Sequence, residues 1–128
     1  MLKKIIFYCL LLIGLGRCAA KIPTTSQLED AEQLSIKRST IVSLAESATC
    51  TNASEWSYSP LGSKPCGGPW SYIAYSDNIN TLYFTNLIEQ YKLAETAYNE
   101  KWSVLSDCSM VAEPSGLECQ NGIAVLIY

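Results

Sequence analysis

The sequence predicts an α+β domain in which two helices pack on a small, mostly antiparallel sheet and two disulfides staple the fold. Three observations support this fold class. Apolar residues recur at helical spacing over 80–102, an aromatic run at 70–76 alternates as a strand does, and four cysteines follow the leader. For a chain of this size, these features indicate one domain over 27–128.

The helix over 80–102 is the strongest element that the sequence predicts. Its apolar residues fall three or four positions apart and so lie along one face: Phe84, Leu87, Ile88, Tyr91, Ala94, Tyr98 and Trp102. Asn80 suits the N-cap. The preceding residues 70–76 are rich in β-prone aromatics. A turn at Asp77-Asn78 would let this strand and the helix bury their apolar faces against each other.

A second helix is expected over about 27–48. Ser26 and Glu29 have the spacing of a capping box, and apolar residues follow at helical intervals. The pattern predicts one helix and is less regular near Ser39, where it leaves a break open. Residues 49–69 are rich in Ser, Pro, Gly and Asn and predict a loop. After the central helix we expect two or three strands, with a turn at Asn121-Gly122 before an apolar last strand.

The first twenty residues have the pattern of an export signal. Lys3 and Lys4 precede an apolar run over 5–15 that is too short to span a bilayer as a helix. Cleavage after Ala20 would leave a short tether over 21–26. Alternatively, residues 15–18 resemble a bacterial lipobox, which would place a lipid anchor on Cys18. Both interpretations predict an exported protein, periplasmic or extracellular.

The charge balance argues against nucleic-acid partners. Three of the nine basic residues lie in the leader, so six bases face all 12 acids and the net charge after cleavage is −6. Such a chain repels phosphate backbones. We expect a protein partner, whose identity the sequence does not specify, and we leave the oligomeric state open.

Four cysteines remain after the leader: Cys50, Cys66, Cys108 and Cys119. In an exported domain they suggest two disulfides, although three pairings exist. Turn-rich stretches separate Cys50 from Cys66, and a hairpin around 113–116 could place Cys108 opposite Cys119. We therefore favour Cys50–Cys66 with Cys108–Cys119. The chain has no histidine and no Cys-x-x-Cys pair, so no metal or other cofactor is expected.

The pattern Cys-Gly-Gly-Pro-Trp-x-Tyr-x-x-Tyr-Ser at 66–76, with Ser-Asp-Cys at 106–108, resembles a group of small exported bacterial proteins of no assigned activity. The resemblance covers about residues 48–122. It implies export and disulfides, and no mechanism.

The absence of histidine removes the common nucleophilic mechanisms, so no catalytic residue is assigned and a non-enzymatic role is expected. The predicted function is that of an exported binding protein, with inhibition of a secreted hydrolase as one form. Trp56, Tyr58 and Trp70 are the candidate binding residues, because Trp and Tyr anchor interfaces. The alternatives are a structural lipoprotein anchored through Cys18 and a hydrolase that uses Glu95 or Asp107.

Overall fold

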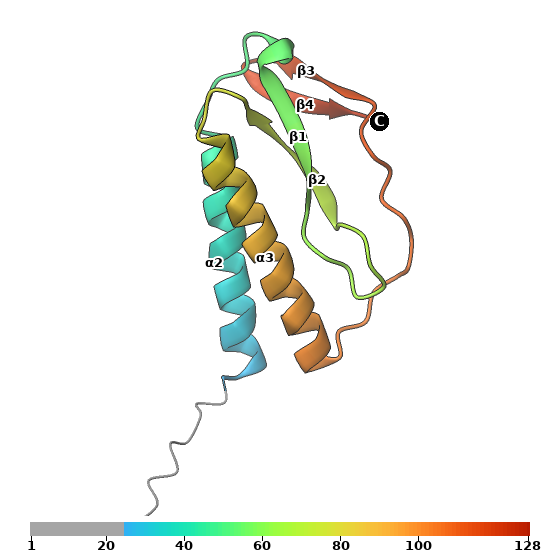
Figure 1. Cartoon of the computed structure of the whole chain (residues 1–128). Coiled ribbons are helices and arrows are strands. Elements are labelled where there is room, and N and C mark those ends of the chain that lie inside the picture. The colour runs from blue at the N-terminus through green and yellow to red at the C-terminus, as the bar shows by residue number, and fades with distance from the viewer. Residues whose placement is uncertain (1–24) are drawn as a thin grey trace, which may run out of the picture.

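The computed structural model describes residues 25–128. Its elements run in the order α2 (Gln27–Ala45), the 3₁₀ turn η1 (Ala53–Glu55), β1 (Trp56–Leu61), β2 (Ser71–Ser76), α3 (Thr81–Trp102), β3 (Gly116–Gln120) and β4 (Ile123–Ile127). Figure 1 shows α2 and α3 side by side next to the β1–β2 hairpin, with the β3–β4 hairpin near the end of α2. The α+β prediction is confirmed. The strands form two separate two-stranded sheets rather than one.

Helix α2 begins at the predicted capping box. The Ser26 hydroxyl accepts the Glu29 backbone N–H at 3.2 Å, and the Glu29 carboxylate accepts the Ser26 N–H at 2.6 Å. The break that the sequence left open near Ser39 does not occur. The Ser39 and Thr40 hydroxyls donate to the Ile36 carbonyl at 2.9 and 3.0 Å, which accommodates these polar side chains within a continuous helix.

Helix α3 has the predicted N-cap, because the Asn80 side chain accepts the Tyr83 N–H at 3.0 Å. It ends at Ser103, which adopts a left-handed conformation with φ of 49°. The predicted apolar face is the buried one: Phe84, Ile88 and Tyr91 all belong to the core.

The core lies between the two helices and the β1–β2 sheet. Phe84 and Ile41 are completely or almost completely buried, and the Tyr75 ring of β2 lies 4.6 Å from the Phe84 ring, centroid to centroid. Leu61 and Ile73 reach the same cluster from the sheet. Burial of each such side chain contributes about 2 kcal/mol.

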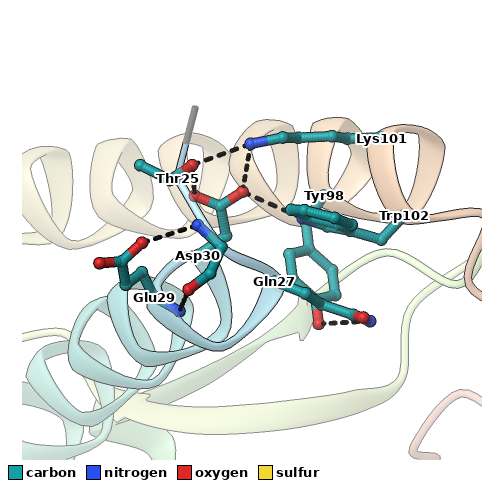
Figure 2. A network of polar contacts seen from close by, with 8 residues as sticks. Thr25, Gln27, Glu29, Asp30, Tyr98, Lys101 and Trp102 are labelled. Atoms are coloured by element: carbon teal, nitrogen blue, oxygen red, sulfur yellow. Dashed lines mark hydrogen bonds and ion pairs between the residues drawn. The ribbon is translucent and has the colours of Figure 1, made fainter. Parts of the chain in front are cut away.

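A polar network joins the first turn of α2 to the last turn of α3 (Figure 2). The Asp30 carboxylate accepts hydrogen bonds from the Lys101 ammonium and from the Trp102 indole N–H, the latter at 3.0 Å. The Thr25 hydroxyl donates to the same carboxylate. Lys101 first, then Thr25, lowers the pKa of Asp30 from 3.8 to about 2.

The loop predicted over 49–69 is wrong in its middle, because residues 56–61 form β1, while residues 62–69 are irregular as expected. This strand pairs antiparallel with β2, with Trp56 opposite Ser76 and Leu61 opposite Ser71. The serines and Pro60 of β1 interrupt the alternation of apolar and polar residues by which a strand is predicted from sequence. Pro60 is tolerated because β1 has an unpaired edge toward which a proline nitrogen can point.

The β3–β4 hairpin turns at Asn121-Gly122, as predicted. Both residues have positive φ, 52° and 82°, which two-residue hairpin turns of this kind require. Two strands, β3 and β4, follow α3, in agreement with the two or three that were expected, and residues 103–115 have no regular secondary structure in the described chain.

The favoured disulfide pairing is wrong. The bonds are Cys50–Cys119 and Cys66–Cys108, with Cα–Cα distances of 5.3 and 5.5 Å. Strand β1 runs between Cys50 and Cys66 and, at six residues, carries the chain about 20 Å away. The two bonds close loops with sequence separations of 69 and 42, each contributing about 4 kcal/mol on the chain-entropy account.

No helix within residues 25–128 is long and apolar enough to cross a membrane. The leader, with Cys18, and residues 21–24 of the tether lie outside the described residues.

The low pKa of Asp30 predicts a pH dependence of stability. The unfolded carboxyl binds its proton at higher pH than the folded one, so the contribution of Asp30 is complete above about pH 4 and is lost as the pH falls toward 2. Thermal unfolding should show a lower Tm for Asp30→Asn than for wild type at pH 7, and the difference should vanish near pH 2. Glu32→Gln, at an exposed position of the same helix, is the control and should follow wild type throughout.

The disulfide pairing can be checked by peptide mapping without reduction. Trypsin together with a protease that cuts after glutamate places the four cysteines on separate peptides, 47–55, 56–89, 102–118 and 119–128, because neither enzyme cuts before Pro65 or Pro114. We expect the first peptide joined to the last, and the two middle peptides joined to each other. A linkage between 47–55 and 56–89 would contradict the structure.

Candidate functional site: an exposed and braced segment

The segment over 103–115 joins α3 to β3 and carries the most exposed large apolar side chains. Leu105 is 92% exposed and Met110 is 85% exposed. In Figure 1 the segment leaves the end of α3, passes the connection between β1 and β2, and runs along the side of the molecule away from the helices. Single exposed apolar residues are common on protein surfaces, so the significance of these two depends on how the segment that carries them is held.

Both ends of the 103–115 segment are held by hydrogen bonds to the folded body. At the start, the Val104 N–H donates to the Asn99 carbonyl at 3.0 Å. At the end, Pro114 is buried and its carbonyl accepts the Tyr58 hydroxyl at 2.9 Å. The next N–H, of Ser115, donates to the Ile127 carbonyl at 2.7 Å. The segment therefore has fixed ends.

Lys64 holds the middle of the segment. Its side chain is only 6% exposed, and its ammonium group donates to the Asp107 carboxylate at 3.1 Å and to the Ser109 carbonyl at 2.9 Å. The same nitrogen lies 5.1 Å from the centroid of the Trp70 ring, which gives a cation–π contact. The Cys66–Cys108 disulfide adds a covalent link to the segment between Asp107 and Ser109, the two residues that Lys64 contacts.

The turn that carries Lys64 is itself fixed to α3. The Ser63 N–H donates to the Glu95 carboxylate at 2.6 Å, and the Asn99 side-chain amide donates to the Ser63 carbonyl at 2.8 Å. Gly62 has φ of +84°, and a Cβ there would lie 2.6 Å from the Glu95 carboxylate. Only glycine permits this approach. The braces of the segment thus rest on a rigid support.

Glu95 and Asp107, the two carboxylates named above for a hydrolase, both accept hydrogen bonds from neighbouring groups of the fold. Glu95 accepts the Ser63 N–H and the Tyr91 hydroxyl, the latter at 3.0 Å. Burial, followed by the charge of Glu95, raises the pKa of Tyr91. Asp107 accepts from Ser109 and from Lys64, which lower its pKa in that order. These contacts give both carboxylates a structural role.

The three predicted binding residues lie on the β1–β2 hairpin or next to it. Trp56 lies at the start of β1 and Trp70 lies just before β2, where it packs over Lys64 and is 41% exposed. Tyr58 lies between them, half-buried, with its ring 6.0 Å from that of Tyr72 and its hydroxyl bonded to Pro114. Trp56 and Tyr58 share one face of β1, whereas Trp70 lies beside Leu61 at the other end of the strand, and both Tyr58 and Trp70 support the 103–115 segment.

Sequence reasoning missed the 103–115 segment and Lys64. The apolar pairs at 104–105 and 110–111 show no regular pattern, and Lys64 stood in a polar loop with nothing to mark it as buried. One signal was available. Ser106-Asp107 and Pro114 break helices and strands, and their positions among the apolar residues favour irregular structure.

No cluster of three or more cysteine or acidic side chains suited to a metal ion occurs in the described part of the chain. Comparison of the sequence with protein-family models and curated proteins, and of the fold with solved structures, finds no match.

Removing the Lys64 ammonium should loosen the 103–115 segment without breaking the disulfide. We expect Lys64→Met to lower the free energy of unfolding by about 2 kcal/mol, because it leaves charge-assisted hydrogen bonds unmade. Backbone order parameters at 104–111 should fall from about 0.8 to below about 0.6 in ¹⁵N relaxation.

Lys92→Met is the matched control, since Lys92 pairs with Glu89 at 3.4 Å and both side chains are more than half exposed. Its effect on unfolding should stay within about 0.5 kcal/mol. Unchanged order parameters in Lys64→Met would show that Lys64 does not brace the segment.

Proposed function

We propose that this chain is an exported binding protein that inhibits a secreted protein-cleaving hydrolase by inserting the 103–115 segment into its active-site cleft. One observation carries the proposal: Leu105 and Met110 are highly exposed on a backbone that is fixed at both ends and in the middle. Exposed apolar side chains on a braced segment suit a protein that must bind tightly.

Bracing matters because binding has an ordering cost. A flexible loop loses conformational freedom when it enters a cleft, at about 0.5–1.5 kcal/mol for each immobilised side chain rich in rotamers. The disulfide, Lys64 and the Tyr58–Pro114 contact meet part of this cost during folding. More of the contact energy of Leu105 and Met110 is then available for affinity.

The side chains of the segment indicate what kind of cleft it would enter. Leu105 and Met110 fit a hydrolase with an apolar specificity pocket. Exposed Asp107 and Glu113 lie in the same segment, so basic groups at the rim of the cleft would complement it. The net charge of −6 expected after leader removal favours the same partner.

The disulfides support export. Structural disulfides form and persist in oxidising compartments, which include the periplasm and the extracellular space. A lipid on Cys18 would tether the same binding domain to a membrane, so the inhibitor proposal holds with either form of the leader.

The direct test is inhibition of a panel of secreted endopeptidases that cleave after large apolar residues. We expect the oxidised protein to inhibit at least one of them, and Leu105→Asp and Met110→Asp each to raise the inhibition constant at least about 30-fold, the equivalent of a 2 kcal/mol hot spot. Reduction of the disulfides should also weaken inhibition.

Leu82→Asp provides the control, because Leu82 is 81% exposed but lies on α3, outside the segment. This variant should inhibit as wild type does. Absence of inhibition across the panel would contradict the proposal, as would rapid turnover of the segment as an ordinary substrate. Inhibition that survives both segment variants would place the contact elsewhere on the protein.

A further inference from the structure

The two disulfides differ in how open they are to solvent. Cys66 and Cys108 are both exposed. Cys50 is only 3% exposed, and its partner Cys119 is half-buried within β3. The bonds also lie at opposite ends of the β1–β2 hairpin, because Cys66 belongs to the connection between β1 and β2, whereas the β3–β4 hairpin lies at the other end of these strands (Figure 1). A reagent in solution therefore reaches one bond without reaching the other.

The space beside Cys66 is open. Gly67 and Gly68 follow this residue, and a Cβ at either position would have no neighbouring atom within 4 Å. The other bond is enclosed, since the Cys50 N–H donates to the Gly122 carbonyl at 2.8 Å and so joins this cysteine to the turn of the β3–β4 hairpin. A reductant attacks the enclosed bond only after the hairpin opens, but it attacks the exposed bond directly.

Opening the exposed bond would leave the core intact. Neither of its cysteines belongs to the buried apolar cluster that holds the helices on the β1–β2 sheet. A turn of its own also fixes the position of Cys66. The Lys64 N–H donates to the Gly68 carbonyl at 2.8 Å, and the Lys64 carbonyl accepts the Gly67 N–H at 2.9 Å. The effect of reduction is therefore confined to the 103–115 segment.

The remaining noncovalent contacts would keep the two thiols near each other. Lys64 donates to Asp107 and to Ser109, the residues on either side of Cys108. The two ends of the segment also keep their hydrogen bonds to the folded body. The Asp107 side chain is 71% exposed, so its ion pair with Lys64 holds the segment less firmly than the covalent bond does. The reduced segment would be mobile, yet close enough to Cys66 for the bond to form again.

We propose that Cys66–Cys108 is a reversible redox switch, which a protein dithiol of the Cys-x-x-Cys class opens while Cys50–Cys119 stays closed. Opening the bond changes the 103–115 segment from a braced to a mobile form. The selective opening stands by itself. Its consequence for function, weaker inhibition, rests on the inhibitor proposal, because a mobile segment loses conformational freedom when it binds.

The exchange balances in two steps. A thiolate of the reductant attacks the Cys66 sulfur, and the bond to Cys108 breaks with its electron pair on the Cys108 sulfur, which takes a proton from water. The second thiolate of the reductant then attacks the first sulfur of the reductant and releases the Cys66 thiolate, which is protonated in turn. The reductant ends as a disulfide, and this chain has gained two electrons and two protons.

The test follows both bonds while a thioredoxin-type dithiol, kept reduced by its reductase and NADPH, acts on the oxidised wild-type protein. Free thiols are trapped at intervals with N-ethylmaleimide, and the peptides 56–89 and 102–118 are compared with 47–55 and 119–128. We expect the first pair to be labelled at least about tenfold faster. At that stage the circular dichroism spectrum should be unchanged, and backbone order parameters at 104–111 should fall from about 0.8 to below about 0.6.

Re-formation of the bond tests whether the switch is reversible. In a fixed concentration of oxidised glutathione, the wild-type protein should recover the Cys66–Cys108 bond. Lys64→Met should recover it at least about fivefold more slowly, because loss of this contact lowers the effective concentration of one thiol at the other. Lys92→Met is the matched control and should recover as wild type does, since Lys92 pairs with Glu89 on the surface of α3.

Several outcomes would overturn the proposal. Equal rates of reduction for the two bonds, or faster loss of Cys50–Cys119, would show that exposure does not select between them. Loss of the circular dichroism signal as Cys66–Cys108 opens would make this bond a requirement of the fold rather than a switch. Unchanged order parameters at 104–111 after its opening would show that it does not control the segment.

A separate measurement distinguishes failure of the switch from failure of the inhibitor proposal. If the oxidised protein inhibits an endopeptidase, selective reduction should raise the inhibition constant at least about tenfold, and an unchanged constant would contradict the regulatory role of the bond. If the oxidised protein inhibits none, the inhibitor proposal fails, and the labelling rates and order parameters still decide whether the bond is a switch.

Discussion

The small size of the core governs the rest of this structure. Seven apolar residues are buried in the described chain, and the cluster centres on Phe84, which contacts Tyr75 of β2 and lies between the two helices. The cluster holds α2, α3 and the β1–β2 sheet together. It does not extend to the β3–β4 hairpin or to residues 103–115, which other interactions must hold in place.

Covalent bonds and one buried cation hold these outer parts. Cys50–Cys119 fixes the β3–β4 hairpin, and the Cys50 N–H donates to the Gly122 carbonyl at 2.8 Å in support. Cys66–Cys108 and Lys64 fix the 103–115 segment. A segment fixed in this way can leave its side chains in solvent, because its position does not depend on burying them. The exposed Leu105 and Met110 follow from this arrangement.

The caps, the helices and the turn at Asn121-Gly122 were predicted because they depend on neighbouring residues. Ser26 and Glu29 lie three residues apart, and the apolar positions of α3 repeat within each turn. Strand β1 was missed because its pairing with β2 outweighs the weak propensity of its serines and of Pro60. The candidate site was missed for a similar reason, since nothing near Lys64 in the sequence shows that Asp107 and Ser109 will surround it.

The sequence by itself determined the α+β class, both helix starts, the aromatic strand and the presence of two disulfides, since these follow from local spacing, composition and cysteine number. Tertiary structure decided which cysteines pair, that the strands divide into two sheets, and which apolar residues stay in solvent. Short disulfide loops looked favourable because they are close in sequence. Packing instead carried Cys50 away from Cys66 along β1 and brought together residues whose separations of 69 and 42 no local pattern encodes.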